Sequence, residues 1–137
     1  LPHRLEDLGD HGGVRWINDS IATAPEAAVA ALDAFPGEVA TYIGGGADRG
    51  FDFAPLAAAL SASAVQNVIL LPPGGPVMQK TIPGAQLVSD LAEAVALAAR
   101  VTPAGSVVLF SPASPSYGVF ANFEERGNVF RDLVQAL

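Results

Sequence analysis

Short apolar runs rich in β-branched residues alternate along this chain with Ala-rich segments of helical periodicity. In segment 24–35, Val29, Leu32 and Phe35 fall on one stripe, as in a helix with one buried side. Similar patterns predict helices over 53–62, from a cap at Ser89 to Arg100, and over 122–136. Strands are predicted over 13–18, 39–43, 67–71, 86–88 and 106–110, whereas 72–76 is a predicted loop and 77–86 is ambiguous between a short helix and a turn.

Strands separated by helices of about three turns are typical of βαβ units. The predicted fold is therefore α/β: an open, doubly wound, mostly parallel sheet with helices on both faces (Rossmann-like). We expect residues 1–137 to form one such domain. Ligands of these folds bind where the loops leave the carboxyl ends of the strands. That rule selects four loops, which are 19–23, 44–52, 72–76 and 111–117.

The charge and composition narrow the classes of partner. The net charge of −7 disfavours nucleic acid, because such a surface repels phosphate backbones. No apolar run approaches the roughly 20 residues of a membrane-spanning helix, and the start of the chain does not resemble a signal peptide, so no membrane insertion is expected. The absence of cysteine excludes thiolate chemistry and fits a cytoplasmic location.

The glycine loop Gly44-Gly45-Gly46-Ala47-Asp48-Arg49-Gly50 is the first candidate site. Its glycines could let a ligand approach the backbone, or could only permit a tight turn. It is not a P-loop, because no lysine and hydroxyl residue follow the last glycine. Arg49 could grip a carboxylate with two parallel hydrogen bonds, or form a salt bridge with Asp48 or Asp52.

The loop after the first predicted strand is the second candidate. Thr23 and Glu26 have the spacing of a capping box, which predicts a structural role for Thr23 at the start of a helix. That helix start could also favour a bound anion. Asp19 has no evident structural role at a strand end and could accept hydrogen bonds from a ligand.

The loop Ser111-Pro112-Ala113-Ser114-Pro115-Ser116-Tyr117 is the third candidate. A nucleophilic serine would need a histidine partner and a GxSxG turn, and the sequence has no GxSxG. Ser116 and Tyr117 are therefore expected to bind through hydrogen bonds rather than to react. In the segment that opens the last predicted helix, Arg126 is expected to pair with a nearby carboxylate.

Taken in order, these segments resemble the carboxy-terminal domain of the Mur ligases, and among them the glutamate-adding members. The resemblance covers the whole chain, and its specificity comes from the ordered set rather than from any one motif. The matching segments are Leu-Pro-His-Arg at 1–4, Trp-Ile-Asn-Asp-Ser at 16–20, Ala-Thr at 22–23, Gly-Gly with Asp-Arg-Gly at 45–50, Phe-Asp-Phe at 51–53, Ser-Pro-Ala at 111–113 and Asn-Phe-Glu-Glu-Arg-Gly at 122–127.

The resemblance implies part of an ATP-dependent ligase that joins glutamate to UDP-MurNAc-L-alanine in peptidoglycan precursor synthesis. ATP, Mg²⁺ and the UDP-sugar would be bound mainly by a central ATPase domain and an amino-terminal domain outside this chain. Within this chain, the resemblance implies that Arg4 and Asp19 would contact the nucleotide. The carboxylates of glutamate would be held by Thr23, Arg49, Ser116 and the backbone around Tyr117 and Phe123.

Three positions depart from the family pattern. Ile21 and Arg49 stand where these ligases commonly have lysine, and Ser-Pro-Ser-Tyr replaces an Ala-Ser pair followed by an apolar residue. These changes surround the amino-acid pocket, so the chain could belong to the branch that adds L-glutamate rather than D-glutamate. The alternative of another class is a stand-alone doubly wound module that senses a nucleotide or a small acid.

Overall fold

A computed structural model describes residues 1–137 as one six-stranded sheet with five helices. The strands are β1 (Glu6–His11), β2 (Val14–Asn18), β3 (Val39–Gly45), β4 (Asn67–Leu71), β5 (Gln86–Leu87) and β6 (Val107–Phe110). The helices are α1 (Pro25–Asp33), α2 (Ala54–Ser61), α3 (Gly75–Thr81), α4 (Leu91–Val101) and α5 (Phe123–Gln135).

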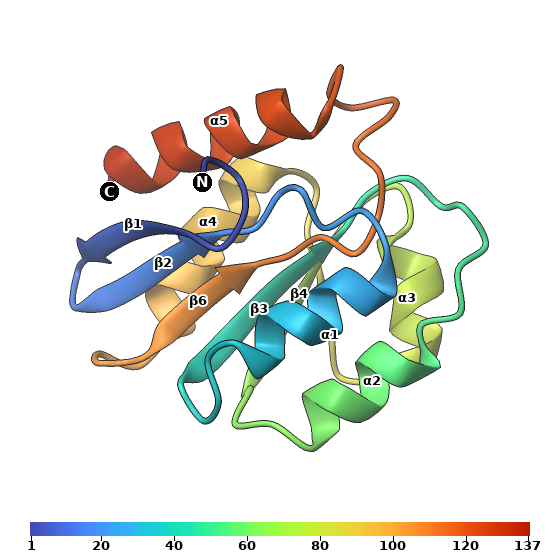
Figure 1. The fold of residues 1–137 in the computed structure, drawn as a ribbon, viewed down its shortest axis with the longest axis horizontal. Coiled ribbons are helices and arrows are strands. Elements are labelled where there is room, and N and C mark those ends of the chain that lie inside the picture. The colour runs from blue at the N-terminus through green and yellow to red at the C-terminus, as the bar shows by residue number, and fades with distance from the viewer.

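The strands lie in the order β1-β2-β6-β3-β4-β5, and every neighbouring pair except β1 and β2 is parallel. This confirms the predicted α/β fold. Helices α1, α2 and α3 cover one face of the sheet, and α4 and α5 cover the other (Figure 1). Alternate residues of each strand therefore enter different cores: in β6, Leu109 packs on the first face and Phe110 on the second.

Four predictions of local structure were wrong. The edge strand β1 was missed, because Glu6–His11 is polar and contains no apolar run. Helix α3 begins at Gly75, inside a predicted loop, because Pro76 is tolerated in the first turn of a helix. The cap of α4 is Asp90 rather than Ser89; the Asp90 carboxylate accepts a hydrogen bond from the Glu93 N–H.

The fourth error concerns the proposed capping box. The N-cap of α1 is Ala24, and no side chain caps this helix. The hydroxyl of Thr23 makes no hydrogen bond with another residue, because Thr23 lies one position before the cap. Thr23 is thus left with a free polar group beside the start of a helix.

Close packing requires the three glycines after Tyr42. Strand β3 continues through Gly44 and Gly45. A Cβ at Gly44 would lie 2.5 Å from the Tyr42 Oη, one at Gly45 2.6 Å from the Leu71 N, and one at Gly46 2.6 Å from the Pro115 O. Only glycine lets the Tyr42 ring and the two neighbouring chain segments pack this closely.

Candidate functional site

The carboxyl ends of β2, β3, β4 and β6 lie at one edge of the sheet, as predicted, because the four strands are parallel. From adjacent β3 and β6 the chain leaves in different directions: α2 follows β3 on one face, and α5 follows β6 on the other. This is the topological switch point at which doubly wound sheets bind ligands. The two loops touch there, since the Ala47 N–H donates to the Pro115 carbonyl over 2.9 Å.

One hollow at this edge, here called the hydroxyl pocket, brings together four of the predicted binding residues. Its volume is about 150 Å³, which is smaller than the roughly 300–1,000 Å³ of sites for drug-sized ligands and leaves room only for a small ligand. Its lining residues are Thr23, Pro115, Ser116, Tyr117, Asn122 and Phe123.

The hydroxyl pocket has the chemistry of an anion site. It lies between Thr23, just before α1, and Phe123, the first residue of α5, so two helix N-termini flank it. The N–H of Phe123 has no acceptor within its own helix, as at any helix start. The hydroxyls of Thr23, Ser116 and Tyr117 make no hydrogen bond to another residue of the chain and are free to bind a ligand.

Arg49 does not line the hydroxyl pocket but lies against Tyr117, which does. Its guanidinium carbon is 5.6 Å from the centre of the Tyr117 ring, a cation–π contact. The alternative salt bridges are not formed: Asp48 accepts from the Gly50 N–H, and Asp52 accepts from the Ala54 N–H. Arg49 is exposed and carries its positive charge without a carboxylate partner.

A second hollow, the amino-terminal groove, holds Arg4 and Asp19 together with Ile21 and several alanines of α1. Asp19 is buried and already has a structural role that its sequence position did not reveal. Its two carboxylate oxygens accept from the Leu5 N–H and the Ser111 Oγ–H, over 3.0 and 2.8 Å. Burial raises the pKa of Asp19 above its ordinary value, although both hydrogen bonds and the charge of Arg4 lower it.

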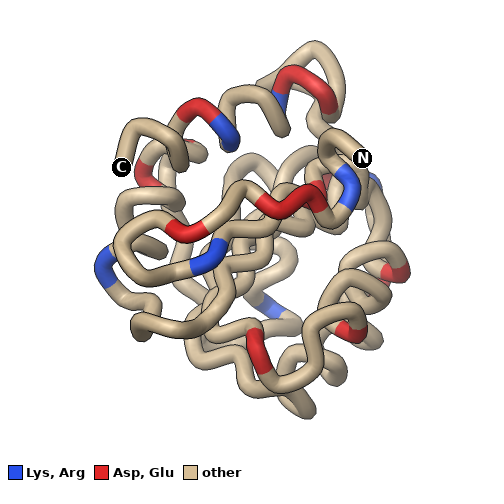
Figure 2. Tube along the Cα trace, turned by 60° about the vertical axis from the view of Figure 1, so that its left-hand side comes forward, with Lys and Arg blue, Asp and Glu red and all other residues tan.

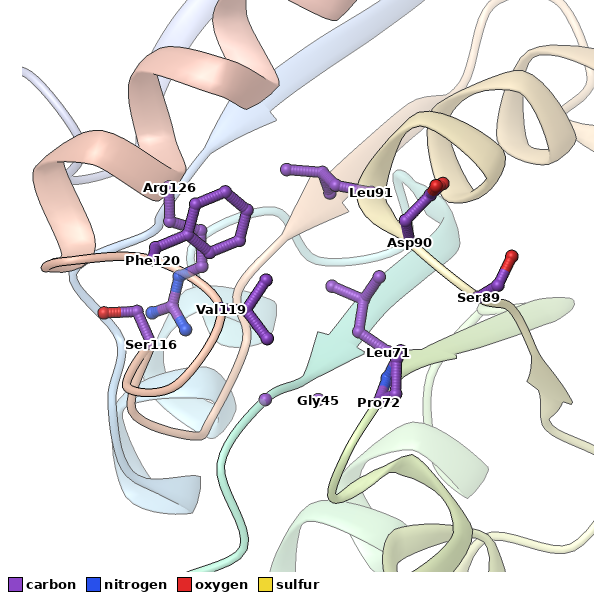
Figure 3. Close-up of a pocket in the computed structure, with 11 residues that line it drawn as sticks. Gly45, Leu71, Pro72, Ser89, Asp90, Leu91, Ser116, Val119, Phe120 and Arg126 are labelled. Atoms are coloured by element: carbon purple, nitrogen blue, oxygen red, sulfur yellow. The ribbon is translucent and has the colours of Figure 1, made fainter.

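The predicted pairing of Arg126 with a carboxylate is wrong. Arg126 is only 1% exposed, and its guanidinium donates to the Ser20 Oγ, the Ser20 carbonyl and the Ser114 carbonyl rather than to any acid. Arg126 lines a third cavity (Figure 3). Ser116 lines both this cavity and the hydroxyl pocket. An arginine four residues after an N-cap is usually expected to be exposed, so the sequence alone carried no signal of this burial.

The rest of the surface offers no competing site of strong charge. Basic positions lie apart from one another along the chain, interspersed with more numerous acidic ones (Figure 2). No group of three or more His, Asp or Glu side chains is placed to hold a metal ion, so we derive no step through a metal from these residues. None of the five helices is long and apolar enough to span a bilayer.

Comparison with known sequences bears on what this edge binds. The family model described as "Mur ligase, glutamate ligase domain" matches residues 3–114. The chain belongs to the Mur ligase family. A UDP-N-acetylmuramoyl-L-alanine–L-glutamate ligase of Salinispora tropica is 46% identical over 98% of the chain and 31% of the relative. A UDP-N-acetylmuramoylalanine–D-glutamate ligase of Symbiobacterium thermophilum is 42% identical over 100% of the chain and 31% of the relative.

Solved structures confirm the fold. A bifunctional folylpolyglutamate synthase/dihydrofolate synthase of Yersinia pestis superposes with a TM-score of 0.68 at 23% identity, covering 97% of the chain and 31% of that protein. The MurF ligase of Thermotoga maritima, in complex with ADP, gives a TM-score of 0.66 at 20% identity, covering 99% and 32%. The chain spans about a third of the length of the curated relatives it matches. The ligases of Salinispora tropica and Symbiobacterium thermophilum are both longer than this chain, so neither supports the alternative of a stand-alone module.

Proposed function

We propose that residues 1–137 form the carboxy-terminal domain of an ATP-dependent ligase that adds glutamate to UDP-MurNAc-L-alanine, and that this domain binds the incoming glutamate. The observation that carries the proposal is the hydroxyl pocket. It combines free hydroxyls and two helix N-termini, and an unpaired arginine, Arg49, lies against its Tyr117; this set suits an amino acid with two carboxylates.

The proposed contacts follow from the lining of the pocket. The Thr23 and Ser116 hydroxyls and the free N–H of Phe123 donate hydrogen bonds to carboxylate oxygens. Arg49 supplies a charge-assisted contact from beside the pocket, where the cation–π interaction with Tyr117 holds it. Arg49 replaces a lysine of the family pattern, so the charge is kept while the donor geometry becomes a planar fork.

Nucleotide contacts are proposed for Arg4 and Asp19 in the amino-terminal groove. Arg4 is exposed and free to meet a phosphate, whereas each oxygen of Asp19 keeps one lone pair for a ribose hydroxyl. ATP and Mg²⁺ would be bound mainly by the remainder of the ligase. A cytoplasmic location belongs to the same proposal.

In this reaction ATP phosphorylates the terminal carboxylate of UDP-MurNAc-L-alanine, and the glutamate amine attacks the resulting acyl phosphate. The new C–N bond forms as the C–O bond to phosphate breaks, and phosphate leaves. The part played by this chain is to hold the amine in place, so that a bimolecular step proceeds within one complex. No residue of the hydroxyl pocket is required to react covalently.

The proposal specifies glutamate and leaves its enantiomer to experiment, since relatives of both kinds are about equally similar. The full-length ligase that contains this chain is assayed for phosphate release with ATP, UDP-MurNAc-L-alanine and either D- or L-glutamate. We expect release with one enantiomer. Release with neither would refute the proposed function.

A further inference from the structure

Arg126, in α5, ties the start of its own helix to the loop after β6 and to the loop after β2, which lies 106 residues earlier in the sequence. Its Nε donates to the Ser20 Oγ over 3.0 Å, its Nη2 to the Ser20 carbonyl over 2.7 Å, and its Nη1 to the Ser114 carbonyl over 2.9 Å. The Ser20 hydroxyl in turn donates to the Phe123 carbonyl over 2.7 Å. One guanidinium therefore connects the loop after β2, the loop after β6 and the first turn of α5.

Each of these anchors is next to a residue of the hydroxyl pocket. Ser20 stands three positions before Thr23, Ser114 stands two before Ser116, and Phe123 is itself in the lining. We propose that Arg126 is the positioning residue of this pocket, because it fixes the three segments that carry Thr23, Ser116 and Phe123. The inference rests on the proposed function for its ligand, and on the hydrogen bonds of Arg126 for its mechanism.

A lysine could not replace this network. The acceptors surround a planar group that presents separate donors on Nε, Nη1 and Nη2, whereas a lysine offers one ammonium at the end of a flexible chain. The guanidinium also lies beside the backbone of Gly46, where a Cβ would come within 3.4 Å of Nη1. The guanidinium lies near Ser116 at one side of the third cavity, opposite Leu71 and Leu91 (Figure 3).

The charge of Arg126 gives a second reason to expect an anion nearby. The two ion pairs of the protein are Arg15–Asp7 and Arg131–Glu6, so Arg126 has no carboxylate partner. Burial lowers the pKa of Arg126 to about 10, which leaves it charged at neutral pH. A buried, unpaired cation is unfavourable by itself. A carboxylate bound near Ser116, which lines both the hydroxyl pocket and the cavity that Arg126 faces, would offset that cost.

The test uses the full-length ligase with Arg126→Lys, which keeps the charge and loses the planar network. We expect the KM for glutamate to rise about tenfold or more, with the KM for ATP within about twofold, because the loss is one of geometry at a single pocket. Backbone amides of residues 19–23 and of the non-proline residues in 113–117 should exchange hydrogen faster than in the wild type. The matched control is Arg131→Lys on the same helix, whose side chain bonds to Glu6 away from the pocket.

Both effects together support the inference, and the absence of either in a folded Arg126→Lys variant overturns it; so does an equal rise in both KM values. If Arg126→Lys does not fold, Ser20→Ala tests the same link by removing the hydroxyl between Nε and the Phe123 carbonyl. If the wild-type ligase does not respond to glutamate, the proposed function fails. Amide exchange then decides alone whether Arg126 fixes the two loops.

Discussion

Gly127 of α5 lies against His3, and this contact predicts that a larger residue at position 127 lowers the free energy of unfolding. A Cβ at Gly127 would lie 2.1 Å from the His3 Nδ1 and 2.8 Å from its Cε1, well inside the roughly 3.5 Å of an ordinary contact. In the Gly127→Ala variant the imidazole of His3 must therefore move by about 1 Å or more. It cannot do so freely, because His3 is buried, contacts the Asn18 Nδ2 at 3.2 Å and packs edge-on against Phe123.

The magnitude follows from two opposing effects. Overpacking of this kind costs about 1–3 kcal/mol, whereas alanine is better than glycine within a helix by about 1 kcal/mol. We expect Gly127→Ala to lower the free energy of unfolding of the 137-residue chain by up to about 2 kcal/mol in urea.

A double-mutant cycle isolates the contact. In the background His3→Gly no imidazole remains, so adding Gly127→Ala should be neutral or stabilising by up to about 1 kcal/mol. The effect of the alanine thus changes sign with the residue at position 3. An equal cost of Gly127→Ala in both backgrounds would refute the reasoning.

Three further predictions concern the other candidate sites. In the full-length ligase, Arg49→Ala should raise the KM for glutamate about tenfold and leave the KM for ATP within about twofold, as measured by phosphate release; equal effects would contradict its assigned role. The pKa of Asp19 is raised in the folded protein, so the wild type loses free energy of unfolding as the pH rises above 3.8 and the carboxyl ionises. Asp19→Asn has no such group, so its stability relative to the wild type should increase over the same pH range. Urea unfolding between pH 3 and 7 measures this difference, and a constant difference would count against the raised pKa. The isolated chain should show no ATPase activity, since its glycine loop lacks the lysine and hydroxyl of a P-loop, and robust hydrolysis would argue against the assignment.

The parts of the fold that followed from the sequence are those whose local pattern and tertiary role agree. Strand β4 was predicted at its observed bounds, because a short apolar run between turn signals is what a buried parallel strand requires. Strand β1 was missed because its stability comes from pairing with β2 and not from its own apolar residues. Helix α3 was obscured by the prolines and glycines that precede and begin it.

The candidate site divides in the same way. Four of the predicted contacts share one pocket because the topology brings all the loops at the carboxyl ends of parallel strands together, and that rule can be applied to a sequence. The roles of Asp19 and Arg126 could not be predicted, because each depends on partners about 90 or more residues away, Ser111 for the first and Ser20 for the second. Local sequence instead suggested a free carboxylate and an exposed ion pair.

A crystal structure of the full-length ligase with glutamate and a non-hydrolysable ATP analogue tests the central claim most directly. We expect one glutamate in the hydroxyl pocket, with carboxylate oxygens within hydrogen-bonding distance of the Thr23 and Ser116 hydroxyls and of the Arg49 guanidinium. Glutamate bound elsewhere in the ligase, with the hydroxyl pocket empty, would contradict it.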